Sequence, residues 1–108
     1  MIIAPIASNP KRVTAGGLVV VSCETRTNAG VLTTPGTSIS IIIYGPGGAT
    51  DQSSVAMTAG STGIYSYAYQ TVTTKPSGER TIEIIAVHTD GTSKVRSVPG
   101  DACNFEVV

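Results

Sequence analysis

Residues 17–27 read GLVVVSCETRT, and their apolar side chains recur on every second position. Successive side chains of a β-strand point to opposite faces of a sheet, so such a strand can bury one row and leave the other in water. Val19, Val21 and Cys23 form one row, and Val20, Ser22 and Glu24 form the opposite one. The stretch therefore predicts a half-buried β-strand with the Val19 row facing a core.

The same alternation recurs along the chain, between clusters of Gly, Pro, Asn, Asp, Ser and Thr that are typical of turns. The later stretches are residues 37–44 (TSISIIIY), 53–58 (SSVAMT), 63–71 (GIYSYAYQT) and 80–88 (RTIEIIAVH). A last strand is expected in two parts, residues 92–97 and 102–108, with a kink at 98–101. No stretch favours an amphipathic helix. The pattern predicts an all-β sandwich of about seven antiparallel strands.

Two connections carry specific expectations. Residues 45–52, GPGGATDQ, are rich in glycine and are expected to form a long turn. Asp90-Gly91 predicts a hairpin after the strand at 80–88, because this dipeptide tolerates the positive φ of a tight turn.

The apolar row of each strand defines the expected core, because a slip of one residue would expose the whole row. For the tyrosine-rich stretch both faces are physically reasonable, since tyrosine is amphipathic, and the buried arrangement is favoured because the opposite row is small and polar at Ser66. The expected core residues are Val19, Val21, Ile39, Ile41, Ile43, Tyr65, Tyr67, Ile82, Ile84, Ala86, Phe105 and Val107.

The N-terminal residues form a separate expectation. Residues 1–12 are predicted to be an arm or edge strand, because Pro5 cannot donate a hydrogen bond to a sheet ladder. Residues 13–108 are predicted to be the sandwich itself. A chain of 108 residues fits one domain of this kind.

Charge and composition exclude several classes of partner. Seven Lys and Arg balance seven Asp and Glu, and charged residues make up 13% of the chain, well below the roughly 25% of average soluble domains. Nucleic acids and anionic membranes require clustered basic residues, so neither is an expected partner. No apolar run reaches the length of a transmembrane helix, and no signal peptide precedes the first strand. The chain is expected either to be a recloned domain or to be made in the cytoplasm and placed on a virion or an extracellular surface.

The inventory of reactive side chains argues against an enzyme. His88 is the single histidine, and no nucleophile or acid is arranged with it in a way that marks a triad. Asp51, Asp90 and Asp101 fall in expected turns without the spacing of a calcium loop. No cofactor, no metal and no catalytic residue is predicted.

Cys23 and Cys103 both fall on inward rows, so they could approach each other across a sandwich. A bridge between them would close a loop of about 80 residues and could contribute around 4 kcal/mol in the chain-entropy model. The alternative is a pair of buried free thiols that act as small hydrophobic residues.

From Val13 to Val108 the sequence resembles the bacterial and phage immunoglobulin-like domains, which share a β-sandwich with fibronectin type III modules. The resemblance rests on VTAGGLVVVSCET, GIYSYAYQT, PSGERTIEIIAVHTDGT and the terminal FEV. It implies an immunoglobulin-like β-sandwich used as a spacer, an adhesin module or a virion decoration. The chain contains no Trp, so the Cys, Trp, Cys pattern of antibody domains is absent.

Two functions follow from these expectations. The first is a non-catalytic structural protein of a larger assembly, such as a capsid decoration or tail-associated protein, with capsid or other assembly subunits, or a homo-oligomer, as partner. The second is a recognition or spacer module of a bacterial cell-surface protein or adhesin.

An assembly face is expected where apolar residues occupy outward rows, because a contiguous apolar patch marks a contact surface. The alternatives are that the N-terminal arm covers this face or that the strand register differs by one residue. The candidate interface residues are Ile42, Tyr44, Ile85 and Val87, with Ile2, Ile3 and Ile6 of the arm as residues that could pair with a neighbouring sheet edge.

Overall fold

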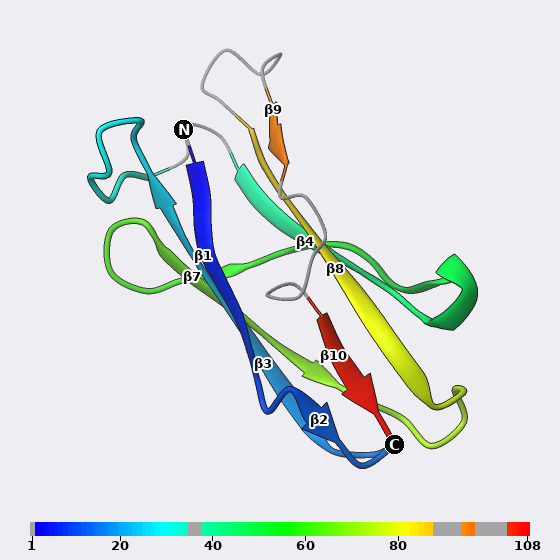
Figure 1. Ribbon diagram of the computed structural model, residues 1–108. Helices are drawn as coiled ribbons and strands as arrows, with labels where there is room; N and C mark the ends of the chain where they lie inside the picture. Colours follow the sequence, from blue (N-terminus) through cyan, green and yellow to red (C-terminus); the bar gives the residue numbers. More distant parts are fainter. Residues whose placement is uncertain (1, 35–37, 88–93, 97–103) are drawn as a thin grey trace.

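The computed structural model describes residues 2–34, 38–87, 94–96 and 104–108, and Figure 1 shows them as an all-β chain. The strands are β1 (Ile2–Asn9), β2 (Arg12–Val13), β3 (Leu18–Arg26), β4 (Ser38–Tyr44), β5 (Thr50–Ala56), β6 (Thr58–Ala59), β7 (Ile64–Gln70), β8 (Gly78–Val87), β9 (Lys94–Arg96) and β10 (Asn104–Val107). One 3-10 turn, Pro46–Gly48, lies between β4 and β5. No α-helix occurs in these ranges, and hence none that could cross a membrane.

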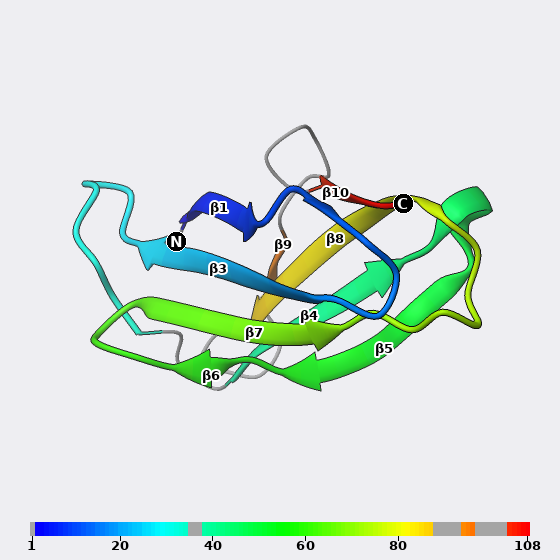
Figure 2. The ribbon, with the colours of Figure 1, turned by 90° about the horizontal axis from the view of Figure 1, so that it is seen from below.

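The strands form two sheets (Figure 2). Sheet A has four strands in the order β1-β3-β7-β6, and sheet B has the order β2-β10-β8-β4-β5 with β9 also paired to β8. Neighbouring strands are antiparallel except β2 and β10, which run parallel. The expectation of a purely antiparallel arrangement is therefore wrong at this pair, because the chain crosses between the sheets after β1 and places β2 beside the C-terminal strand.

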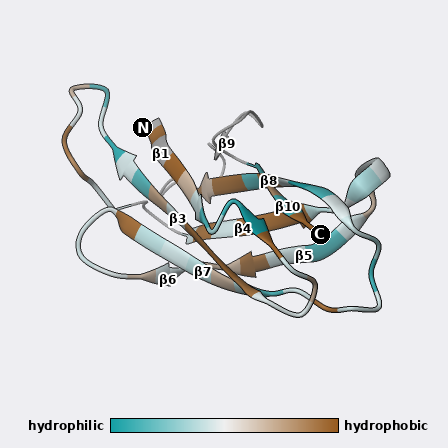
Figure 3. Cartoon of the chain, turned by 60° about the horizontal axis from the view of Figure 1, so that its bottom comes forward, coloured by the Kyte–Doolittle hydropathy of each residue, from teal (hydrophilic) through white to brown (hydrophobic). Residues whose placement is uncertain are grey.

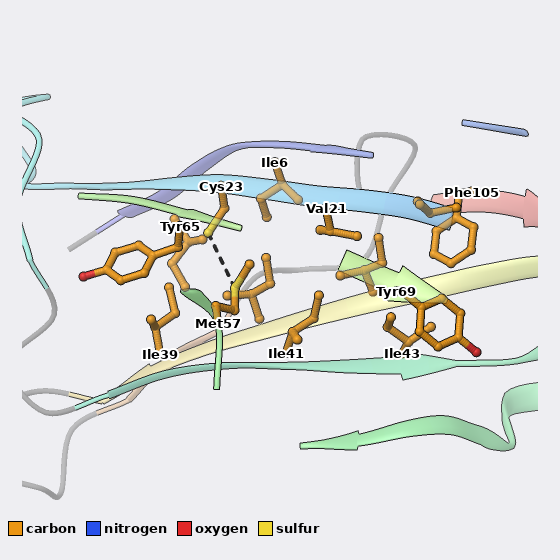
Figure 4. Close-up of a cluster of buried hydrophobic side chains, with 14 of the residues drawn as sticks. Ile6, Val21, Cys23, Ile39, Ile41, Ile43, Met57, Tyr65, Tyr69 and Phe105 are labelled. Carbon is orange, nitrogen blue, oxygen red and sulfur yellow. Dashed lines mark hydrogen bonds between the residues drawn. The ribbon is translucent and has the colours of Figure 1, made fainter. Parts of the chain in front are cut away.

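The core lies between the two sheets. Figure 3 shows hydrophobic residues along β1, β3 and β8, and Figure 4 shows Val21 and Cys23 of sheet A facing Ile39, Ile41 and Ile43 of sheet B. Every expected core residue is buried except Tyr67, which is half-buried and packs against the core. The Tyr67 hydroxyl donates to Oε1 of Gln52 at 3.2 Å, so this ring extends toward the rim.

The expected turn at residues 45–52 is wrong in its second half, because β5 begins at Thr50. The pairing of β5 with β4 shifts register twice, between Ile41 and Ile43 and again between Ile43 and Tyr44. A bulge inserts an extra residue and changes the direction of side chains. β5 therefore does not show the simple alternation by which a strand is recognised in a sequence.

Strands occur in both of the parts in which the last strand is expected. β9 pairs with β8 at residues 85–87, and β10 pairs with β8 at residues 78–81, both on the side away from β4. The Asp90-Gly91 hairpin and the kink at 98–101 lie outside the described residues.

The N-terminal strand is part of sheet A. β1 pairs antiparallel with β3 along its length, with one irregularity between Ile3 and Ile6. Both isoleucine side chains are buried in the core cluster. The arm therefore does not cover the outer face of sheet B.

Candidate functional site

The candidate assembly face lies on the outer side of sheet B. β4 and β8 are direct neighbours, and Ser40 is the partner of Ile85 while Ile42 is the partner of Glu83. Side chains of paired residues lie on the same face of a sheet. Ile42, Tyr44, Ile85 and Val87 therefore share one face, where each is half-buried.

A carboxylate, that of Glu83, lies among these apolar side chains. The pattern of outward apolar residues in the sequence does not predict its contact with them. Glu83 is directly opposite Ile42, and the Tyr44 hydroxyl donates to Glu83 Oε1 at 3.2 Å. The cross-strand pair holds the tyrosine ring over the sheet. Each apolar side chain of this face has a polar cross-strand partner, and these partners are Ser38, Ser40, Thr81 and Glu83. The face is therefore mixed, and Glu83 is already engaged by Tyr44 within the chain.

The N-terminal interface candidates are placed differently. Ile2 begins β1 opposite Arg26. Ile3 and Ile6 are buried in the core of their own chain, so their side chains are not available to a partner while β1 is in place.

A second apolar surface lies on the outer side of sheet A. Leu18 is 48% exposed and Val20 is 40% exposed on the central strand β3. Ala68 of β7 and Ala7 of β1 are exposed on the same face, as the registers with Val20 and Ser22 show. The alternation in the sequence predicts that Val20 points outward, but one outward valine does not predict an apolar surface.

The main polar cluster of the core bridges the two sheets near the start of β8. The Arg80 side chain is 2% exposed and the Asp51 side chain is 8% exposed, and Arg80 Nε lies 2.8 Å from Asp51 Oδ2. Arg80 also donates through Nη2 to the carbonyl of Pro76 at 2.7 Å and through Nη1 to the carbonyl of Gly78 at 3.1 Å. A buried guanidinium is tolerated because its donors are occupied in this way.

Two further groups complete this cluster. The Tyr69 hydroxyl of sheet A donates to Asp51 Oδ2 at 3.0 Å, and Lys75 Nζ donates to the Asp51 carbonyl at 2.7 Å. Burial, with a smaller contribution from the Asp51 hydrogen bond and charge, raises the pKa of Tyr69 to about 12. These hydrogen bonds are all internal, so the cluster anchors β5, β7 and β8 to one another.

A shallow hollow lies at the edge of sheet B. Lys11, Glu79, Asn104, Phe105 and Glu106 line it. Asn104 Nδ2 donates to Glu79 Oε1 at 2.8 Å, whereas Asn104 Oδ1 is buried without a hydrogen bond. The hollow is open and mixed in charge.

Cys23 is a buried free thiol in this structure, and its Sγ donates to Met57 Sδ at 3.9 Å. Burial, with a smaller contribution from the Glu24 charge, raises the thiol pKa to about 12. Cys103 lies outside the described residues, so its approach to Cys23 stays a prediction.

The remaining reactive residues of the sequence are placed as follows. Asp51 belongs to the buried cluster, whereas His88, Asp90 and Asp101 lie outside the described residues. Within the ranges that the structure describes, no group of three His, Cys, Asp or Glu side chains could hold a metal ion. A scan against protein-family models and a search of curated proteins found no match for this chain.

Proposed function

We propose that this chain is a non-catalytic interaction domain that binds a protein subunit of a larger assembly through the outer face of sheet B. The observation that carries the proposal is the position of Ile42, Ile85 and Val87 on the outer rows of two adjacent central strands. An antiparallel sheet with one solvated face places polar residues on that face. Apolar residues gathered on adjacent strands are typical of a contact surface.

An immunoglobulin-like identity belongs to the same proposal. In constant-type immunoglobulin domains strands A, B, E and D form one sheet, and strands C, F and G form the other. The order β1-β3-β7-β6 corresponds to A-B-E-D, and β4-β8-β10 corresponds to C-F-G. The order of strands supports the resemblance of the sequence to bacterial and phage immunoglobulin-like domains.

The setting that we infer is a virion, with this domain as a capsid decoration or tail-associated component. Its support is the composition of the chain, in which 13% of residues are charged. Surface polarity then depends on hydroxyl and amide side chains, as in many virion and extracellular proteins. Such a surface binds through shape and apolar contact rather than through long-range charge steering.

The test is site-specific photo-crosslinking in the particle or cell in which the chain is naturally made. A benzophenone side chain replaces Ile42 or Ile85 on sheet B, and it replaces Ala68 on the exposed outer face of sheet A as the matched control. We expect one product of defined mass from positions 42 and 85 and none from position 68. Products of equal yield from both faces, or none from positions 42 and 85, would overturn the proposal. Mass spectrometry of the product identifies the partner and so distinguishes a virion subunit from a cell-surface protein.

A further inference from the structure

The first strand, β1, is an edge strand, so it can separate from the sandwich after losing its pairing with one neighbour. β1 is the outermost strand of sheet A, where its neighbour is β3. Among the described residues, a hydrogen bond from Ser8 Oγ to the carbonyl of Asn104 at 2.9 Å also holds β1, together with the packing of Ile3 and Ile6 in the core. β2, the next element, belongs to sheet B and stays bound to β10 when β1 is displaced.

The position that β1 occupies is specific for this strand. Its residues pair with Val20–Arg26 of β3, and Ile6 lies directly opposite Cys23 (Figure 4). Ile3 and Ile6 fill places in the core that would otherwise open to water. When β1 is displaced, the edge of β3 loses its hydrogen-bond partners and the places of Ile3 and Ile6 in the core are empty. The β1 of another copy fits there because it has the same sequence.

The connection between β1 and β2 is a short hinge. It consists of Pro10 and Lys11, both exposed. Asn9, the residue before Pro10, is the last residue of β1 and is extended, as a residue before proline prefers. Pro10 and Lys11 bend the chain toward β2. Short hinge loops of this kind favour exchange between copies.

We propose that β1 exchanges between two copies of this chain, so that each β1 pairs with β3 of the other copy. Such a dimer contains the same contacts as the closed monomer. The equilibrium between monomer and dimer therefore depends on the protein concentration relative to the effective concentration of the tethered β1. That effective concentration is of millimolar order for short linkers. Exchange is therefore favoured where copies are concentrated on a common scaffold. The inference does not rest on the outer face of sheet B.

A disulfide trap distinguishes exchange from any other mode of dimerisation. Ala7 and Ser22 are exposed cross-strand partners of β1 and β3, whereas Val20 and Ala68 are exposed partners of β3 and β7, which do not exchange. Ala7→Cys with Ser22→Cys is the test pair, and Val20→Cys with Ala68→Cys is the matched control. Both are made with Cys23→Ala and Cys103→Ser, and their folding is checked by circular dichroism.

Each variant is incubated at millimolar concentration, separated by size, oxidised and analysed on a denaturing gel without reductant. We expect the dimer of the test pair to give a covalent dimer band, and the control pair to give a monomer band from every fraction. A dimer of the test pair that oxidises only to the monomer band would overturn the proposal, as would the absence of any dimer at this concentration.

A second measurement uses the natural β1 and β3 residues in a Cys103→Ser variant. Exchange requires β1 to open, and opening uncovers Cys23, which is buried beside Ile6. We expect Cys23 to be alkylated at least ten-fold faster than the whole sandwich unfolds. Alkylation no faster than global unfolding would overturn the proposal, because β1 would then never open alone.

Discussion

At the scale of single residues, the buried ion pair between Asp51 and Arg80 is the feature least visible in the sequence. Asp51 follows a glycine-rich stretch, where an aspartate normally bonds its own backbone. The bulged pairing of β5 with β4 instead brings its side chain inside, beside the fully buried Arg80. A pattern of period two cannot predict a residue whose direction is set by a bulge.

The ion pair predicts a large loss of stability when one partner is removed. Asp51→Ala leaves the Arg80 guanidinium buried without its carboxylate, and breaking a buried pair in this way costs about 3–5 kcal/mol. The matched control is Glu106→Ala, which removes an exposed pair whose Glu106 Oε1 lies 3.3 Å from Arg12 Nε. The expected loss there is about 1 kcal/mol or less. Urea unfolding measures both, and similar losses for the two variants would contradict the structural role of Asp51.

The two raised pKa values predict a decline of stability in alkali. The Cys23 thiol ionises near its ordinary pKa of 9.0 in the unfolded chain but only at about 12 in the folded chain. The pKa of Tyr69 rises in the same way, from its ordinary value of 10.0 in the unfolded chain to about 12 in the folded chain. Between these values the folded chain binds more protons than the unfolded chain, so the free energy of unfolding falls as the pH rises from about 9 to 12.

Thermal unfolding followed from pH 8 to pH 11 tests this linkage. Tyr69→Phe keeps the aromatic ring near Phe105, with ring centroids 6.0 Å apart, but removes the ionisable hydroxyl. Cys23→Ala removes the thiol. We expect a shallower decline of the thermal midpoint above pH 9 for Cys23→Ala and above pH 10 for Tyr69→Phe. A wild-type midpoint that is flat over this range would contradict the burial of both groups.

At the scale of elements, the sequence predicts those strands whose alternation is regular. The sequence predicts β3, β4, β7 and β8 within a few residues of their bounds, because each buries all or most of one row against the other sheet. β5 was only half predicted, since its bulges disturb the alternation. The assignment of strands to sheets depends on long-range pairing, which a local pattern does not contain.

The central strand of sheet B gives a direct test of the predicted row. Ile41 is completely buried, and Ile41→Ala should lower the free energy of unfolding by about 2–5 kcal/mol through lost burial and a cavity. Val20→Ala on the exposed face of sheet A is the control and should change it by about 0.5 kcal/mol or less. A loss below about 0.5 kcal/mol for Ile41→Ala would place this side chain outside the core.

The turn before β7 offers a second test at this scale. Gly63 has φ +77, and a Cβ there would lie 2.9 Å from the Thr25 carbonyl oxygen and 2.9 Å from the Thr33 nitrogen. Gly30 has φ +88 with nothing near its missing Cβ. Gly30→Ala should therefore cost only the left-handed backbone penalty of about 1–2 kcal/mol. Gly63→Ala should cost about 1–3 kcal/mol more through overpacking. If chemical denaturation gave the same loss of unfolding free energy for Gly30→Ala and Gly63→Ala, the loop after β3 would not be in close contact with this turn.

At the scale of the whole molecule, the described sheet edges are poorly suited to pairing with the edge of a neighbouring sheet. β1 contains Pro5 and a register irregularity, β2 and β6 are two residues long, and β5 carries two register shifts. Natural sheets use such features to prevent edge-to-edge association. The faces of the two sheets are then the larger surfaces that remain for binding. The candidate face could be predicted from the outward rows, whereas its Glu83–Tyr44 contact required the register between β4 and β8.

Charges placed on one face therefore separate folding from assembly. Ile42→Lys with Val87→Glu puts two charges on the outer face of sheet B, and Val20→Lys with Ala68→Glu does the same on sheet A as the control. Both pairs lie outside the core, so each should lower the free energy of unfolding by about 1 kcal/mol or less. Charged side chains must lose water when an apolar interface closes over them, so the sheet B variant alone should lose at least ten-fold in binding to its natural assembly. Thermal unfolding and co-sedimentation with the assembled particle measure the two effects separately. A sheet B variant that keeps its thermal midpoint and still co-sediments like wild type would show that this face makes no contact with the assembly.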